Sequence, residues 1–151
     1  MSKKISVALA QVTQRQFTND LTDYTREIEK ILSGSSETQM VVYPELHLFG
    51  SDTSAKALQE IAQSLDSKFV ADLGEIAKRF GIWLIPGSIV EPAPNNGVYN
   101  TALVFNPAGE LISFYRKIFP WRPSEPFTMG SEFSVFELPG LGRVGLNICY
   151  D

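Results

Sequence analysis

Residues 40–45, Met-Val-Val-Tyr-Pro-Glu, pair a short apolar run with an abrupt polar end. Four consecutive apolar residues are typical of a strand that is buried on both faces of a sheet. The run stops at Pro44, and Glu45 follows directly. In open α/β sheets, functional side chains collect at this carboxyl edge. The stretch therefore predicts a buried strand that carries a carboxylate to the edge of a sheet.

Upstream of this stretch the sequence predicts a strand and then a helix. Residues 5–11 are rich in β-branched and apolar side chains, which favours a strand. Asn19 or Asp20 can cap the helix, and residues 33–36, Ser-Gly-Ser-Ser, end it. The apolar face of this helix recurs at helical spacing and consists of Leu21, Tyr24, Ile28, Ile31 and Leu32.

Downstream of this stretch the sequence predicts two helices and several strands. A short helix is expected over 55–63. A firmer one begins at about Ser67 and stops at Gly81, since glycine is the usual residue just past a helix C-terminus. The next strand is expected over 82–85 and continues past Gly87 to Val90. Strands over 99–105 and 111–116 are expected to form a hairpin, and an irregular stretch follows over 117–133. Two more strands are expected over 134–138 and 143–148.

This order of elements indicates an α/β layered fold with a mixed sheet. A chain of 151 residues with 44% hydrophobic content suits one domain with a real core. The sequence stops at Asp151, just after the apolar strand over 143–148. Such a strand should be covered on both faces and feed another element. We therefore expect a truncated chain.

Composition narrows the classes of partner and site. A net charge of −4 argues against nucleic acid or an anionic membrane as partner. No apolar run approaches the ~20 residues of a membrane span, and no secretory signal follows Met1 to Lys4, so a cytoplasmic protein is expected. One cysteine and one histidine can form neither an internal disulfide nor a structural zinc site. No metal and no cofactor are expected.

Four side chains could carry chemistry, and each also has a plain structural interpretation. Glu45 is either a general base or a solvated carboxylate. Lys117 either stabilises an anion or covers the surface with its apolar stem. Cys149 is either a nucleophile or a small buried hydrophobe. His47 lacks an obvious orienting partner, so it is expected to support a site from behind or to lie on the surface.

Three segments change this balance when they are considered together. Residues 41–46 (Val-Val-Tyr-Pro-Glu-Leu), 115–118 (Tyr-Arg-Lys-Ile) and 145–151 (Gly-Leu-Asn-Ile-Cys-Tyr-Asp) resemble, in order, the signature segments of the nitrilase, or carbon–nitrogen hydrolase, superfamily. The resemblance extends over essentially the whole chain. Smaller similarities fill the gaps, at residues 8–11, 99–102, 129–130 and 141–145.

The resemblance implies a Glu–Lys–Cys triad, here Glu45, Lys117 and Cys149. It also implies a second glutamate after the lysine, and Glu125 fits that place. With Trp121, the sequence is similar to the pattern of the aliphatic amidase and formamidase branch of the family, in which an aromatic side chain lies near the acyl pocket. With the backbone N–H of Tyr150, Lys117 would stabilise the charge on a tetrahedral intermediate. These six residues form the expected catalytic and substrate-binding set.

The family's fold is a four-layer α-β-β-α sandwich of two similar halves, and residues 1–151 are expected to be the first half of a single domain of this type. The function implied is hydrolysis of a small amide, carbamoyl or nitrile bond through a cysteine thioester. The family also implies a homodimer or a higher homo-oligomer.

Three alternatives to this enzyme remain open. The chain could be a non-catalytic nitrilase-like binding or regulatory domain, a plain α/β interaction module, or an inactive fragment of the enzyme, and by itself it is expected to be inactive. The catalytic interpretations require that Glu45, Lys117 and Cys149 converge within about hydrogen-bond reach.

Overall fold

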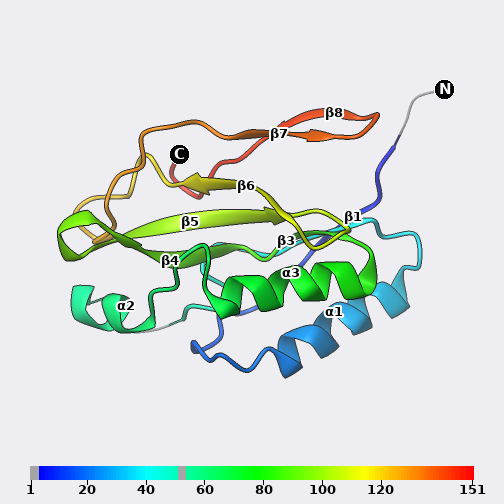
Figure 1. Cartoon of the computed structure of the whole chain (residues 1–151), viewed down its shortest axis with the longest axis horizontal. Helices are drawn as coiled ribbons and strands as arrows, with labels where there is room; N and C mark the ends of the chain where they lie inside the picture. The colour runs from blue at the N-terminus through cyan, green and yellow to red at the C-terminus, as the bar shows by residue number, and fades with distance from the viewer. Residues whose placement is uncertain (1–3, 51–53) are drawn as a thin grey trace.

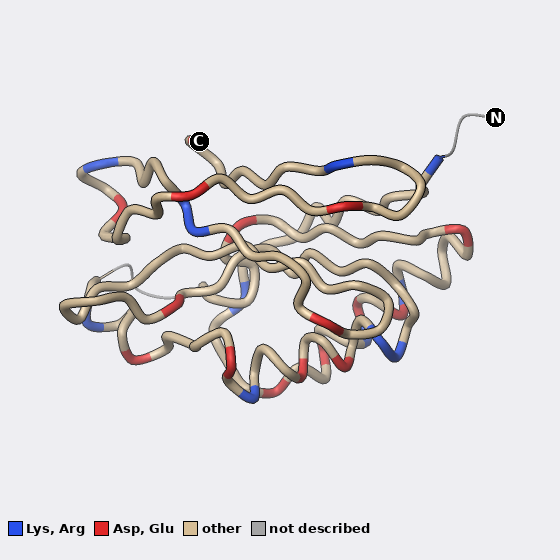
Figure 2. The backbone as a smooth tube through the Cα atoms, turned by 45° about the horizontal axis from the view of Figure 1, so that its top comes forward, with Lys and Arg blue, Asp and Glu red and all other residues tan. Residues whose placement is uncertain are grey.

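In the computed structural model, residues 4–50 and 54–151 are described. Figure 1 shows three layers: helices on one side, a central sheet, and a separate two-stranded hairpin on the other side. Charged residues crowd along the helical layer and are sparse along the central strands (Figure 2). This distribution is expected when the strands are buried and the helices face solvent.

The helices begin and end where their capping residues predict. Helix α1 spans Thr22–Gly34, α2 spans Ala55–Ile61 and α3 spans Lys68–Phe80. Ser54 and Ser67 each accept a hydrogen bond from the backbone N–H three residues later, at 3.3 Å, which satisfies free donors at the helix start. Gly81 ends α3 in the left-handed conformation, with φ of +63°.

The start of α1 is the exception to the expected capping. The residue at the cap position is Leu21, which has no side-chain cap. Asp20 acts one position earlier, because its Oδ1 accepts from the Thr22 N–H at 2.9 Å.

The central sheet joins parallel and antiparallel strands. β1 (Val7–Leu9), β2 (Met40–Val42) and β3 (Trp83–Ile85) run parallel to one another, as alternation with helices requires. β5 (Gly97–Phe105) is antiparallel to β3, to β4 (Ser88–Ala93) and to β6 (Leu111–Arg116). β3 and β4 share one edge of β5, while β6 pairs with the opposite edge. The sheet is therefore mixed, as the sequence predicts.

The expected continuation past Gly87 is confirmed, with one interruption. β3 and β4 run along the same edge of β5, and Gly87 lies between them with φ of +90°. A Cβ atom at this position would lie 2.1 Å from the Pro44 carbonyl oxygen. The glycine thus lets the strand pass directly beneath the residue that precedes Glu45.

β5 is buried on both faces, which explains its long apolar run. Leu103 and Phe105 face the core beneath the helices, whereas Ala102 and Val104 face the hairpin layer. The hairpin consists of β7 (Val135–Leu138) and β8 (Gly142–Gly145). Its side chains that pack on the sheet are Phe136, Leu138 and, beyond the hairpin, Leu146 and Ile148.

The strand expected over 143–148 is shorter than predicted. β8 ends at Gly145, opposite Val135, where its partner β7 begins. Beyond Gly145, buried and exposed side chains still alternate as the sequence pattern predicts, and Leu146 and Ile148 pack against the sheet. Periodicity therefore predicted which side chains are buried but not where the hydrogen-bonded ladder ends. The irregular stretch over 117–133 is confirmed, because these described residues form neither helix nor strand.

The close contact at Gly87 gives the first prediction. Gly87→Ala should destabilise the protein by about 2 kcal/mol or more, because it adds a steric clash to a backbone conformation that alanine rarely adopts. Gly34→Ala is the matched control. Gly34 has nothing within 4 Å of a built Cβ, so the same substitution should be neutral or stabilise by up to about 1 kcal/mol. Denaturant unfolding of both variants measures the difference, and equal stabilities would contradict the prediction.

Candidate active site

Four of the predicted site residues converge from three separate segments. Glu45 follows β2, Lys117 and Glu125 lie in the irregular stretch after β6, and Cys149 lies beyond β8. A carboxylate oxygen of Glu45, one of Glu125 and the Sγ of Cys149 all lie within 4.8 Å of one another. Because these segments are far apart in sequence, the sheet and the hairpin layer are what bring them together.

Lys117 lies at the centre of the cluster and is fully buried, with 0% of its side chain exposed. Its Nζ lies 3.0 Å from Glu45 Oε1 and 3.0 and 2.9 Å from the two carboxylate oxygens of Glu125. Burial acts to lower the pKa of this lysine, but the hydrogen bonds to Glu125 and Glu45, together with their charges, raise it above its ordinary value. The side chain is therefore an ammonium, and the alternative of a surface lysine is wrong.

Glu45 is held by a second buried donor that the sequence analysis did not single out. Asn100, on β5, donates from Nδ2 to Glu45 Oε1 at 2.6 Å and is fully buried. The backbone carbonyl oxygen of Asn100 accepts a hydrogen bond from the backbone N–H of Lys117 at 2.9 Å. The sequence did contain a sign of this role, because an asparagine side chain in a strand buried on both faces needs a specific hydrogen-bond partner.

The loop after Lys117 places Glu125 by backbone contacts. The Trp121 N–H donates to Glu125 Oε2 at 2.9 Å, and the Glu125 N–H donates to the Trp121 carbonyl at the same distance. Gly130 closes the loop through its N–H to the Lys117 carbonyl at 2.8 Å. The Trp121 side chain is 53% exposed, so its ring lies at the surface rather than in an enclosed pocket.

Cys149 lies on a tight turn and is exposed, so the alternative of a buried core cysteine is wrong. Its φ is +50°, which is uncommon for a residue with a Cβ and indicates local strain. Asp151 stabilises this turn: its Oδ2 accepts from the Ile148 N–H at 3.1 Å and its Oδ1 from the Phe119 N–H at 2.9 Å. The sequence analysis quoted Asp151 without giving it a role. Tyr150 is 65% exposed, beside the thiol.

The cysteine is a thiol rather than a preformed thiolate. Partial desolvation by the neighbouring groups raises the pKa of this exposed thiol first, and the negative charge of Glu45 raises it further, while Lys117 opposes them. A thiol of this kind needs a base in contact with it before it becomes a strong nucleophile. Two carboxylates and a thiol can also bind a metal, but Lys117 Nζ already contacts both carboxylates. The ammonium of Lys117 therefore already occupies the position between the two carboxylates.

Two small cavities reach the cluster from different sides. One, of about 280 Å³, runs between the sheet and residues 144–149 and is lined by both Cys149 and Glu45. The other, of about 190 Å³, is lined by Glu45, Glu125 and Gln14. Glu45 is therefore in contact with both cavities.

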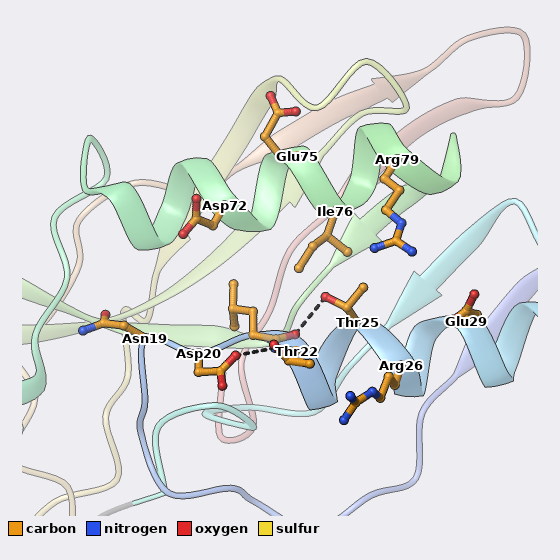
Figure 3. A pocket seen from close by; sticks show the side chains of 11 residues that line it. Asn19, Asp20, Thr22, Thr25, Arg26, Glu29, Asp72, Glu75, Ile76 and Arg79 are labelled. Carbon is orange, nitrogen blue, oxygen red and sulfur yellow. Dashed lines mark hydrogen bonds between the residues drawn. The ribbon is translucent and has the colours of Figure 1, made fainter.

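A larger cavity of about 480 Å³ lies elsewhere, between α1 and α3 (Figure 3). Charged side chains of both helices line it, among them Arg26, Asp72 and Arg79. None of the clustered residues lines it. The arrangement of chemical groups, and not the size of a cavity, therefore locates the candidate site.

Similarity to known proteins agrees with this arrangement. Residues 6–151 match the protein family described as Carbon-nitrogen hydrolase.

The chain belongs to the carbon–nitrogen hydrolase family.

Two named relatives with similar sequences are amidases. A formamidase of Helicobacter acinonychis is 30% identical over 145 residues, which cover 92% of this chain and 42% of that protein. An omega-amidase of Xenopus tropicalis is 38% identical over 124 residues, covering 75% of this chain and 43% of that protein. The chain thus spans less than half the length of these relatives.

Solved structures share the fold. Saccharomyces cerevisiae Nit3, a member of branch 10 of the nitrilase superfamily, superposes with a TM-score of 0.83 at 26% identity. That match covers 99% of this chain and 59% of Nit3. An amidase from Nesterenkonia sp. gives a TM-score of 0.72 at 25% identity, with 97% and 56% of the two chains covered. The observed layers therefore form part of the nitrilase fold, and none of the described helices is long and apolar enough to cross a membrane.

The environment of the thiol gives the second prediction. The alkylation rate of Cys149 by iodoacetamide should rise with pH around a midpoint above that of a free cysteine, because its pKa is raised. Glu45→Gln should lower this midpoint, since it removes a negative charge that disfavours the thiolate. The chain has a single cysteine, so the rate reports one site. Glu29→Gln, on the exposed side of α1, is the control, and an unchanged midpoint in Glu45→Gln would contradict the assignment.

Proposed function

We propose that this protein hydrolyses a small amide through a thioester on Cys149. The observation that carries the proposal is the convergence of the Cys149 thiol, the Glu45 carboxylate and the buried Lys117 ammonium in one cluster. An amide carbon is a poor electrophile, so its hydrolysis needs an activated nucleophile, a general base and stabilisation of an oxyanion. The three groups supply one of these each.

In the acylation step, Glu45 takes the proton from the Cys149 thiol as Sγ attacks the amide carbon. The negative charge that develops on the carbonyl oxygen is stabilised by Lys117 Nζ and by the Tyr150 N–H. The intermediate then collapses: the carbon–nitrogen bond breaks, Glu45 returns the proton to the departing amine, and a thioester remains on Cys149. The raised thiol pKa makes this dependence on Glu45 necessary.

In the deacylation step, Glu45 removes a proton from a water molecule that attacks the thioester carbon. The sulfur leaves, receives the proton from Glu45, and the carboxylic acid is released. Glu125 acts here through Lys117, because its two hydrogen bonds hold the ammonium in place throughout. Because the four groups contact one another, a pH–rate profile would belong to the cluster and not to one residue.

An amide is favoured over a nitrile or a carbamoyl compound because both of the curated relatives described above are named as amidases. The exposed Trp121 and Tyr150 are proposed to contact the substrate. We further propose a cytoplasmic homo-oligomer that uses no cofactor and binds neither nucleic acid nor membrane. Since the chain spans less than half of its named relatives, we propose that it is one half of a single carbon–nitrogen hydrolase domain and is inactive by itself.

Removal of the nucleophile gives the third prediction. In the full-length protein, Cys149→Ala should lower kcat for aliphatic amides by about 10³-fold or more, since the thioester can no longer form. The thermal unfolding midpoint should change little, because the side chain is exposed. Amide turnover and calorimetry measure the two quantities, and a variant with full activity would eliminate the mechanism.

Removal of the ammonium gives the fourth prediction. Lys117→Met keeps the length of the side chain but removes the group that faces the oxyanion, so kcat/KM should fall by about 10²–10³-fold. Lys56→Met is the matched control, because the Lys56 side chain is 87% exposed on α2 and should leave the rate unchanged. Equal rates for the two variants would remove the proposed role of Lys117.

A further inference from the structure

A tight turn, rather than a helix or a strand, carries Glu45. The turn follows β2 and is closed by hydrogen bonds from the His47 N–H to the Pro44 carbonyl, at 3.3 Å, and from the Phe49 N–H to the Leu46 carbonyl, at 2.9 Å. Leu46, directly after Glu45, has φ of +52°, a conformation that side chains with a Cβ rarely adopt. Such a backbone persists only where its surroundings hold it. Something beyond the turn must therefore fix the position of Glu45.

His47 anchors this turn in the interior of the protein. Its side chain is 0% exposed and stacks on the ring of Tyr43, with centroids 4.9 Å apart. Its carbonyl oxygen accepts from the Arg15 N–H at 2.7 Å, and the Gly50 N–H donates to the Arg15 carbonyl at the same distance. The backbone at Arg15 is therefore hydrogen-bonded to both His47 and Gly50, which holds the turn in place.

A carboxylate on α1 faces this histidine. Glu27 Oε1 lies 3.7 Å from His47 Nε2, and Glu27 Oε2 forms an ion pair with Arg15. Tyr24 contributes a third ring, with its centroid 4.8 Å from that of Tyr43. Glu27 and Tyr24 from α1, Tyr43 after β2, His47 from the turn and Arg15 from the preceding segment therefore form one cluster, hereafter the Glu27–His47 cluster.

The cluster gathers several polar atoms in the interior of the protein. Tyr24 Oη, Tyr43 Oη, Glu27 Oε1 and both ring nitrogens of His47 are buried, and none of them makes a hydrogen bond of good geometry with a described residue. The nearest polar groups are the Glu27 carboxylate, beside Tyr43, and the Thr13 backbone, beside His47. Buried polar atoms gathered in this way are normally bridged by internal water, and leaving them unpaired is costly. Packing alone would be served better by apolar side chains. The composition of the cluster therefore indicates a role other than filling the core.

We propose that Glu27 and His47 are positioning residues for Glu45: through the buried Glu27–His47 cluster they fix the strained turn that presents Glu45 to Cys149. The inference rests on the proposed function of Glu45. Neither residue touches the reacting atoms. They act by tying the turn to α1, so that the carboxylate of Glu45 stays where it contacts Lys117 and Asn100.

A mutant cycle in the full-length protein tests this role. Glu27→Gln should lower kcat for an aliphatic amide by about 10- to 100-fold with KM nearly unchanged, as expected for a misplaced catalytic group. Glu29→Gln, on the exposed side of the same helix, should change kcat by less than about twofold. In a Glu45→Gln background, Glu27→Gln should cause no further loss, since residues that act through one group are not additive.

Two outcomes of the cycle would overturn the proposal. One is a Glu27→Gln variant that behaves as Glu29→Gln does. The other is a full additional loss in the Glu45→Gln background, which would indicate general destabilisation. Alkylation of Cys149 by iodoacetamide follows the same cycle without turnover, and His47→Gln provides a second variant if Glu27→Gln does not fold. If Glu45→Gln itself retains wild-type turnover, the proposed function fails, whereas the alkylation cycle still reports on the cluster.

The contact can also be measured directly in the full-length protein, where comparison with a His47→Gln variant assigns the NMR signals of the His47 ring. Burial lowers the pKa of His47, and the facing Glu27 carboxylate opposes this effect. Glu27→Gln should therefore lower the pKa of His47 further, which NMR titration of its ring detects independently of any activity. An unchanged pKa would mean that the two side chains are not electrostatically coupled, and the proposal would fail.

Discussion

The buried ammonium of Lys117 is the constraint on which the candidate site depends. An ammonium taken fully out of water is stable only when opposite charges and hydrogen bonds replace its hydration shell. Glu45 and Glu125 supply both, at 3.0 and 2.9 Å. Each carboxylate must then be held in turn, Glu45 by Asn100 and by the turn after β2, and Glu125 by the backbone of Trp121. The geometry of several loops thus follows from one charge.

The sheet provides the rigid part of this arrangement. β5 pairs on both edges and is buried on both faces, so its side chains have fixed directions. Asn100 lies on this strand, and its backbone carbonyl accepts a hydrogen bond from the backbone N–H of Lys117. This bond connects the start of the irregular stretch to the sheet. The side chain and the main chain of one residue therefore contact two members of the candidate triad. A polar residue in such a strand is costly to bury, and the hydrogen bonds of the Asn100 Nδ2 group and backbone carbonyl offset part of that cost.

Sequence patterns predicted most elements because local chemistry determines them. Serine caps, the glycine after α3 and the apolar runs of β2 and β5 are set by nearby residues. The end of β8 could not be predicted, because it depends on where β7 begins. Three motifs indicated Glu45, Lys117 and Cys149, whereas Asn100, Asp151 and the burial of His47 depend on contacts between distant segments. A single sequence shows these residues but not what they meet.

The wide separation of the clustered residues along the chain has a consequence for folding. Lys117 lies 72 residues from Glu45, and Asn100 lies 55 residues from it. Contacts of this range close only after the intervening chain has been ordered, which is slow compared with the formation of helices. Until then, Cys149 is an ordinary cysteine without a nearby base. The contact between the thiol and its proposed base therefore forms late in folding, whereas Cys149 in a newly made or partly unfolded chain ionises and reacts as a free cysteine does.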